Sequence, residues 1–244
     1  MRAKIEWRPD GNHLMQSTAI VTGGTGGLGT AVVGRLLDDG WRVVVPWIVE
    51  QELERVQRRD EVELVEADLF DPEAARAVVE AASRLPEVPL RGLVNLVGGF
   101  AAGGRVDETP IDDFERQFRL NLRPTYLMAQ AALPRLLQHG GGSIVCVGTR
   151  AALQPFSGAA GYVASKAAVI AFANALAVEY RDDGVRCNTI LPSVIDTPGN
   201  RASMPNGDHE KWVKPAEIAG VIAHLLSSDS APTSGAAIPV YGRA

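Results

Sequence analysis

The sequence predicts an α/β protein whose single domain is built on a doubly wound parallel sheet of about seven strands, with helices on both faces. Short β-branched runs alternate with longer segments of helical apolar spacing along nearly the whole chain, and this alternation is typical of parallel sheets. No repeat, low-complexity tract or linker interrupts the pattern. With 46% hydrophobic residues among 244, the chain can bury one sizeable core. We assign residues 16–244 to this domain and residues 1–15 to an N-terminal extension.

Hydrophobic runs place the expected elements. The strands are expected at Ala19–Val21, Val43–Val45, Glu61–Val65, Leu93–Val97, Ser143–Val147, Val185–Leu191 and Ala236–Val240. The helices are expected at Leu28–Leu37, Gln51–Arg58, Pro72–Arg84, Ile111–Leu137, Ala160–Tyr180 and Pro215–Leu226. Pro124 and Pro134 should break or kink the longest of these, so we expect two helices there.

Capping and turn residues support several of these boundaries. In Asp71-Pro72 and in Thr109-Pro110, a capping side chain precedes a proline at the first helical position. Gly40 and Gly184 follow two expected helices, where a left-handed residue is favoured. These signals indicate where the chain turns between layers.

Charge and composition limit the classes of partner. The net charge is −5 and no long basic run occurs, which argues against nucleic acid and anionic membranes. Gly, Pro or a charge interrupts every apolar run, and the first fourteen residues lack the apolar middle of a secretion signal. Cys146 and Cys187 lie in apolar runs, typical of buried reduced thiols, and the histidines show no ligand spacing. We therefore expect a cytoplasmic protein without a metal site.

Tyr162 and Lys166 stand one helical turn apart in the run GYVASK. Positions i and i+4 share one helix face, so the phenol and the ammonium would point into the same space. A neighbouring cation favours the phenolate and lowers the phenol pKa toward the range useful for acid–base catalysis. Because this spacing also occurs on ordinary surfaces, the pair gains its weight from its context.

A glycine-rich turn, TGGTGGLG at residues 22–29, follows the first expected strand and opens the first expected helix. Gly23 and Gly27 would let the backbone turn tightly and approach a phosphate. Gly29 would let the helix press against the sheet, while the helix N-terminus would meet a pyrophosphate. A tight turn without a ligand has the same composition, but the strand–turn–helix context favours a Rossmann-type dinucleotide site.

These motifs together resemble the short-chain dehydrogenase/reductase family: TGGTGGLG, Asn95 and Gly98 in VNLVGG, Asn121 in RLNL, Thr149, YVASK, and NTILPS at 188–193. The resemblance spans residues 16–242, and the spacing from Thr149 to Tyr162 is that of the family's catalytic hydroxyl and tyrosine. It implies an NAD(P)-dependent oxidoreductase that interconverts a small or medium carbonyl compound and a secondary alcohol by hydride transfer.

The same resemblance implies a role for each catalytic candidate. Tyr162 is the acid when a carbonyl is reduced and the base when an alcohol is oxidised. Lys166 lowers the tyrosine pKa and holds the nicotinamide ribose, and Asn121 anchors a water in a proton relay to Lys166. Thr149 hydrogen-bonds the reacting oxygen, although the family usually has serine there. Its extra methyl stiffens χ1 and takes space beside the substrate. The alternative is that Thr149 merely ends a strand in an inactive site.

Further residues are implied around the cofactor. Asp68 would face the adenine amino group, and Ile195 and Thr197 would line the nicotinamide carboxamide, although each is also an ordinary strand-end or loop residue. The full implied set is Thr22, Gly23, Thr25, Gly27, Leu28, Gly29, Trp47, Asp68, Leu69, Asn95, Val97, Gly98, Tyr162, Lys166, Pro192, Ile195 and Thr197.

The choice between NAD and NADP stays open. An acidic residue about twenty positions after the glycines would bind the ribose hydroxyls of NAD, and a basic one would accept the phosphate of NADP. Trp47 and Ile48 stand there instead, and Gly26 stands where many NADP-using relatives carry Arg. Trp47 either covers the adenosine or packs against the following helix.

The substrate is expected beneath a short polar lid at Pro198–Lys214, with Phe100, Gln154 and Phe156 completing the pocket. Such a lid suits a small or medium molecule better than a long acyl chain. Arg150 could meet an anionic substrate, although a solvated arginine at a strand end is more common.

Two other functions are open to the same fold. A non-catalytic dinucleotide sensor would have no chemical need for Tyr162, Lys166 and Asn121. A reductase of carrier-bound acyl groups would need docking arginines, and the matching positions hold Gly140 and Asp183.

The expected partners are a small-molecule substrate and further copies of the chain, with no nucleic acid and no membrane. The helix at 160–180 is apolar on more than one face, and the resemblance implies that this helix pairs between subunits. We therefore expect a homodimer or homotetramer.

Overall fold

The computed structural model describes residues 17–243, and its frame is a seven-stranded sheet in which neighbouring strands run parallel. The strands are β1 (Thr18–Thr22), β2 (Arg42–Trp47), β3 (Val62–Glu66), β4 (Leu90–Asn95), β5 (Gly142–Val147), β6 (Val185–Pro192) and β7 (Ala237–Val240). Their order is β3-β2-β1-β4-β5-β6-β7, so the topology switches direction between β1 and β4. Ligands of such sheets bind beyond the carboxyl ends of the strands at this switch point. The expected extension at residues 1–15 lies outside the described residues.

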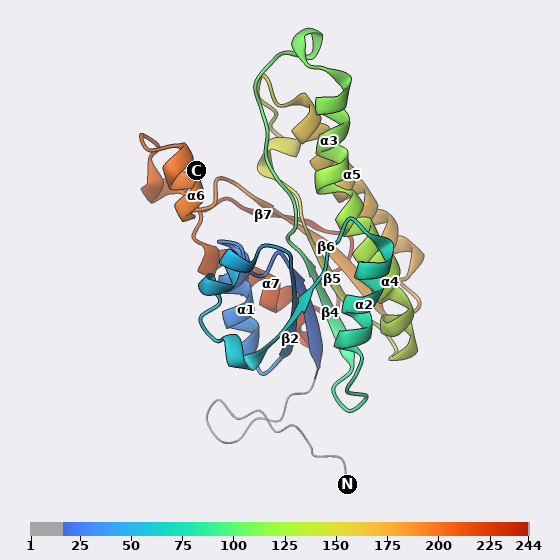
Figure 1. Ribbon diagram of the computed structural model, residues 1–244. Coiled ribbons are helices and arrows are strands. Elements are labelled where there is room, and N and C mark those ends of the chain that lie inside the picture. The colour runs from blue at the N-terminus through green and yellow to red at the C-terminus, as the bar shows by residue number, and fades with distance from the viewer. Residues whose placement is uncertain (1–16, 244) are drawn as a thin grey trace.

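Helices cover both faces of this sheet, as the sequence predicts. They are α1 (Gly29–Asp38), α2 (Pro72–Ala82), α3 (Ile111–Asn121), α4 (Arg123–Gln138), α5 (Ala160–Glu179), α6 (Pro198–Ser203) and α7 (Pro215–Leu226). Short 3₁₀ turns are η1 (Glu50–Arg55), η2 (Arg59–Glu61), η3 (Val106–Glu108), η4 (Arg150–Ala152), η5 (His209–Lys211) and η6 (Ser228–Ser230). Figure 1 shows α1 and α7 on one face and α2, α4 and α5 on the other.

Successive side chains of the central strands enter two separate cores. Ile20 and Val44 pack with α2, α4 and α5, whereas Ala19, Val21 and Val43 pack with α1 and α7. This follows from the two-residue period of a strand, and it explains why the central strands are apolar throughout.

The prediction of a helix at Gln51–Arg58 is wrong. The chain forms only the 3₁₀ turn η1 there and then a turn, with Leu53 and Val56 as its buried side chains. Val49 precedes η1 without a capping side chain. A longer helix here would be stabilised by only two buried apolar side chains and by no capping side chain, which is too little to form it.

The expected starts and breaks of helices had mixed outcomes. Asp71 caps α2 by accepting from the N–H of Glu73, and the segment 111–137 divides into α3 and α4 at Leu122. Thr109, however, does not cap α3, because its hydroxyl donates to the carbonyls of Gly104 and Arg105.

Pro134 does not end α4 either. It lies inside that helix on the exposed side. The carbonyl left without a partner one turn earlier therefore faces water, which lowers the cost of a proline in a helix. Gly40 and Gly184 have the predicted left-handed conformation, with φ of 82° and 76°.

The helix α5 is long and apolar enough, by length and composition, to cross a membrane, with a mean hydropathy of 1.5. From the sequence we expected charges such as Lys166 to exclude a membrane-spanning helix. By this measure Lys166 does not exclude one. Core helices of soluble proteins pass the same test, and α5 packs against β5, β6 and α3. The finding is weak evidence for a membrane.

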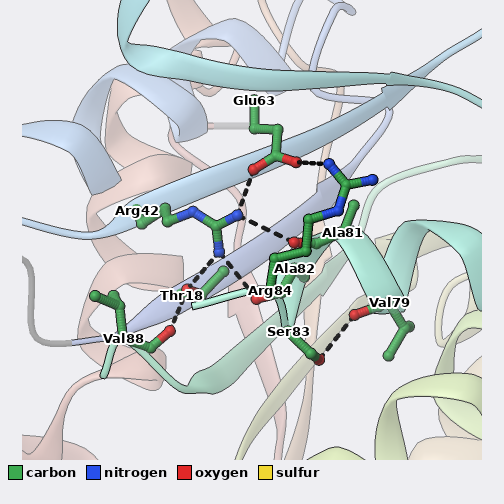
Figure 2. A network of polar contacts seen from close by, with 9 residues as sticks. All are labelled: Thr18, Arg42, Glu63, Val79, Ala81, Ala82, Ser83, Arg84 and Val88. Carbon is green, nitrogen blue, oxygen red and sulfur yellow. Dashed lines mark hydrogen bonds and ion pairs between the residues drawn. The ribbon is translucent and has the colours of Figure 1, made fainter. Parts of the chain in front are cut away.

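A buried arginine joins the amino-terminal edge of the sheet to α2. Arg42 begins β2, is only 7% exposed, and donates to the carbonyls of Ala81 and Ala82 at 3.0 and 2.9 Å (Figure 2). It also donates to Thr18 Oγ1 at 3.1 Å and forms an ion pair with Glu63. The last carbonyls of a helix have no partner within it, so the guanidinium satisfies them and complements the helix dipole.

We expect Arg42→Met to lower the free energy of unfolding by about 3 kcal/mol, because Glu63 and two helix-end carbonyls lose a buried donor. Arg84 pairs with the same Glu63, but its side chain is 70% exposed. Arg84→Met should therefore cost less than about 1 kcal/mol. Urea denaturation followed by circular dichroism measures both variants, and equal losses would contradict the assigned role of Arg42.

Candidate active site

The end of β5 holds the two side chains that stand one turn apart on α5. Lys166 is buried, and its Nζ donates to the carbonyl of Val147, the last residue of β5, at 2.9 Å. The Tyr162 phenol lies close enough to the side chain of Thr149, two residues beyond that strand, for the threonine hydroxyl to lower the phenol pKa. Thr149 Oγ1 also accepts from the N–H of Ala151 at 3.2 Å, and this contact fixes its rotamer. The phenol, the threonine hydroxyl and the ammonium are therefore gathered at one strand end.

Asn121 reaches the same place from the end of α3. It is fully buried, its Oδ1 accepts from the N–H of Gly99 at 2.9 Å, and its Nδ2 donates to Ser165 Oγ at 3.1 Å. Gly98 separates Asn121 from Lys166. A Cβ added to Gly98 would lie 2.6 Å from Asn121 Oδ1 and 3.1 Å from Lys166 Nζ. The glycine thus allows the amide and the ammonium to approach one another.

Burial dominates the ionisation of both groups on α5. It raises the pKa of Tyr162, and the hydrogen bond with Thr149 lowers that pKa only in part. The lowered tyrosine pKa expected from the sequence is therefore not what the protein alone shows, because spacing reveals neighbours and not desolvation. Burial also lowers the pKa of Lys166 to about 8, against an opposing contribution from Cys146.

The glycine turn has the shape of a phosphate site. Gly23 adopts a positive φ of 65°, and α1 begins without a capping side chain and without an acidic residue in its first turn. An N-terminus of this kind attracts anions. Gly29 has a different role from the one expected. A Cβ on it would lie 2.0 Å from the Gly23 carbonyl oxygen, so it permits packing against the turn and not against the sheet.

Two other segments lie against this turn. Thr22 Oγ1 accepts from the N–H groups of Leu96 at 3.0 Å and Val97 at 3.3 Å, just after β4. A Cβ on the exposed Gly27 would lie 2.9 Å from the methyl of Thr197, which caps α6 at the start of the expected lid. The cradle between the turn, β4 and the lid therefore fits a dinucleotide in which glycines approach the phosphates.

The remaining cofactor candidates differ in how they lie. Trp47 is half-buried at the end of β2, and Asp68 is exposed and accepts from the N–H of Phe70. The side chain of Leu69 is buried in the core, so only its backbone can face a ligand. The Oδ1 of the buried Asn95 has no hydrogen-bond partner among the described residues.

The nicotinamide end of the expected site lies beyond β6. Pro192 ends that strand and is buried. Ile195 forms an isolated parallel bridge with Val213, and its carbonyl accepts from Asn200 Nδ2 at 2.8 Å. Leu28 packs partly against the core of α1 and α7. Among residues 17–243, no cluster of His, Cys, Asp and Glu is arranged to hold a metal.

Tyr162 also lines a pocket of about 570 Å³ formed with α3 and the segments 101–110 and 158–161. The ring of Phe100 stands edge-on to Tyr162, with centroids 5.0 Å apart, and Phe156 lies 6.3 Å from Phe100. These two phenylalanines are at least half exposed, at 63% and 50%. They form an apolar wall beside the phenol.

Sequence reasoning missed three residues of this region. Ser165 donates to the carbonyl of Tyr162 and accepts from Asn121, and its place within YVASK could have drawn attention to it. Glu52 accepts from Thr25 Oγ1 at 2.7 Å, and no local pattern announces this contact. The same is true of Gln117, a buried residue of α3 that lines the pocket beside Tyr162.

A family model described as short chain dehydrogenase matches residues 17–207. The chain belongs to the short-chain dehydrogenase family. It is therefore an oxidoreductase, and its cofactor is NAD or NADP. The family assignment favours this function over a non-catalytic sensor.

Similar proteins cover nearly the whole chain. The 2-(R)-hydroxypropyl-CoM dehydrogenase of Xanthobacter autotrophicus is 30% identical, over 93% of this chain and 98% of that protein. The 4-formylbenzenesulfonate dehydrogenase of Comamonas testosteroni is 31% identical, over 94% and 98%. Among solved structures, a blue fluorescent protein from a metagenomic library in complex with NADPH is 30% identical, with a TM-score of 0.82 and coverage of 95% and 98%.

The pKa of Lys166 predicts how stability depends on pH. An unfolded lysine titrates near ~10.4. Because the folded value is about 8, the unfolded chain binds more protons between these values, and stability rises with pH through this window. The free energy of unfolding of the wild type should therefore rise relative to that of Lys166→Met as pH increases from 8 to 10. Urea titrations at each pH test this, and parallel profiles would contradict a depressed lysine pKa.

Proposed function

We propose that this dehydrogenase interconverts a small or medium carbonyl compound and a secondary alcohol, with Tyr162 transferring the proton. The observation that carries the proposal is the meeting of Tyr162 with Thr149 and of Lys166 with Val147 at the end of β5. When bound, NAD or NADP supplies or accepts the hydride. The chain's own residues hold the oxygen and move the proton.

Each residue's surroundings suit its proposed role. Burial keeps the Tyr162 phenol protonated at neutral pH, which is the form that donates a proton to a carbonyl oxygen. Thr149 stabilises the charge that develops on that oxygen, since its hydroxyl already contacts the phenol. Lys166 directs one N–H at Val147, and its other donors would hold the nicotinamide ribose. Asn121, buried against Gly99, keeps the proposed relay beside Lys166 in place.

The size of the pocket beside Tyr162 supports a small-molecule substrate. The two relatives are named for 2-(R)-hydroxypropyl-CoM and 4-formylbenzenesulfonate, which are small or medium molecules. We also propose a cytoplasmic location. Cys146 and Cys187 are free and buried, as reduced core thiols are in that compartment.

Variants of the two hydroxyl groups test the proposed chemistry. Tyr162→Phe should abolish turnover while NAD(H) or NADP(H) still binds, because it removes the proposed proton carrier. Thr149→Ser should keep most activity, whereas Thr149→Val should lose about 10²–10³-fold in kcat, the scale of one oxyanion donor. Calorimetry measures cofactor binding, and steady-state kinetics on a ketone found by screening measures turnover.

Two outcomes would contradict this assignment. Near-wild-type turnover by Tyr162→Phe would place the proton donor elsewhere. The absence of binding of both cofactors up to millimolar concentration would remove the oxidoreductase function as a whole.

We further propose that the chain forms a homodimer or homotetramer through the outer face of α3, α4 and α5. A mainly apolar hollow on this face is lined by Phe118, Leu122, Tyr126 and Phe172 together with Arg119 and Arg123, and the Tyr126 and Phe172 rings lie 5.6 Å apart. Tyr126 is 47% exposed although it is aromatic. A cluster of apolar side chains that is only partly buried is typical of subunit interfaces.

Light scattering on the eluting protein tests the assembly. The wild type should show two or four times the chain mass of 26.0 kDa. Tyr126→Glu should shift the mass toward the monomer, because it buries a charge in the interface. Ile48→Glu is the control, since Ile48 is 62% exposed just after β2, away from this face. A monomeric wild type at micromolar concentration would contradict the proposal.

A further inference from the structure

Arg150 is next in sequence to Thr149, the residue proposed to contact the reacting oxygen. It has no acidic partner in the part of the chain that the structure describes. It follows Thr149 and opens η4. Its Nε donates to Gln154 Oε1 at 2.9 Å, and its guanidinium carbon lies 5.0 Å from the centre of the Tyr241 ring. The side chain is half-buried. A cation held this way, without a carboxylate, keeps its full charge available.

The ring beneath Arg150 is itself held in place. The carbonyl of Tyr241 accepts from Ser193 Oγ at 2.7 Å, and Gly242 turns the chain with a φ of 65° against the backbone of Val213. Ser193 directly follows β6 and Tyr241 directly follows β7, so both lie at the carboxyl edge of the sheet. The platform for the guanidinium is therefore on the same edge as the catalytic residues.

Stacking leaves part of the guanidinium unused. A guanidinium over an aromatic ring is attracted to the π-face of the ring, and those of its N–H groups that point away from the ring remain free to donate. Gln154 takes only the Nε donor of Arg150. The two terminal nitrogens form a fork that matches the two oxygens of a carboxylate, or two of the three oxygens of a sulfonate.

The segment that carries Arg150 also forms one side of the substrate region. Thr149 lies near the Tyr162 phenol at its beginning, and at its end the ring of Phe156 lies 6.3 Å from that of Phe100, which stands against Tyr162. In the sequence, Arg150 and its partner Gln154 lie between these two residues. A substrate whose carbonyl meets Thr149 and whose apolar body lies along the phenylalanines would have Arg150 at the rim of the same site.

We propose that Arg150 binds an anionic group of the substrate, so that the substrate is a small ketone or secondary alcohol with an apolar body and a carboxylate or sulfonate end. This rests on the proposed function, and it names the substrate class of that same site. Arg150 acts as a specificity-determining residue, and the proton and hydride steps are unchanged.

Matched ketone pairs test the proposal. One pair is 4-acetylbenzoate and its uncharged methyl ester, and the other is 4-acetylbenzenesulfonate and its uncharged sulfonamide. The enzyme is assayed as the full chain with whichever reduced cofactor binds. Arg150→Gln removes the charge, and Arg150→Lys keeps it without the fork. Arg181→Gln is the control, because Arg181 is exposed in the turn between α5 and β6, at the opposite edge of the sheet.

The wild type should prefer the anionic member of at least one pair by about 10- to 100-fold in kcat/KM, as expected for a hydrogen-bonded charge pair. Arg150→Gln should remove most of that preference by raising KM, with kcat changed by less than about threefold. Arg150→Lys should recover part of it, and Arg181→Gln should behave as the wild type. The pair that shows the effect tells a carboxylate from a sulfonate.

Several results would overturn the inference. One is equal use of both members by the wild type. Another is an equal loss for both members in Arg150→Gln together with a lower melting temperature, which would make Arg150 a structural support for Tyr241. If no ketone is reduced, calorimetry of the two anions with the cofactor-saturated enzyme decides, and the absence of binding counts against the inference. Failure to bind any nicotinamide cofactor would overturn the proposed function and this inference together.

Discussion

The hydrogen bond from Lys166 Nζ to the Val147 carbonyl is the contact on which the active site depends. It fixes α5 against the end of β5, and the same helix turn then presents Tyr162 to Thr149. The contact is costly, because the ammonium is buried deeply enough to lower its pKa to about 8. A buried cation with one backbone partner is therefore a strained group, suited to a cofactor hydroxyl that supplies further partners. The Lys166 ammonium is therefore both the group that is costly to bury and the group proposed to hold the cofactor.

At the opposite edge of the sheet, arginines join the strands to the ends of helices. Arg42, Arg91 and Arg186 stand at or near the beginnings of β2, β4 and β6, and each donates to backbone carbonyls at or just after a helix end. Arg186, for example, reaches the carbonyls of Leu225 and Ser227 at the end of α7. In a parallel sheet every connecting helix ends near the start of the next strand, so one cation there completes the carbonyls left without partners. The carboxyl edge is thereby left to carry the ligands.

Much of the fold and part of the site could be predicted because their signals are local. The alternation of strands and helices, the glycine turn and the one-turn spacing of Tyr162 and Lys166 each depend on neighbouring residues. Contacts between distant segments could not be predicted, and the pairing of Glu52 with Thr25 is an example. The segment 51–58 has helical spacing but too few buried contacts to form the helix. The raised pKa of Tyr162 escaped prediction for a related reason, since desolvation is a property of the assembled core.

Thr149, which stands where the family usually has serine, lies next to a residue that is held by contacts with distant parts of the chain. The hydroxyl of Ser193, just after β6, donates to the carbonyl of Tyr241. That ring supports Arg150, and Arg150 directly follows Thr149, which replaces the usual serine. Residues far apart in the sequence thus meet at the carboxyl edge of the sheet, while Tyr162, Lys166 and Asn121 keep the family's pattern. The proposal above assigns this set of contacts to substrate recognition and leaves the proposed proton chemistry unchanged.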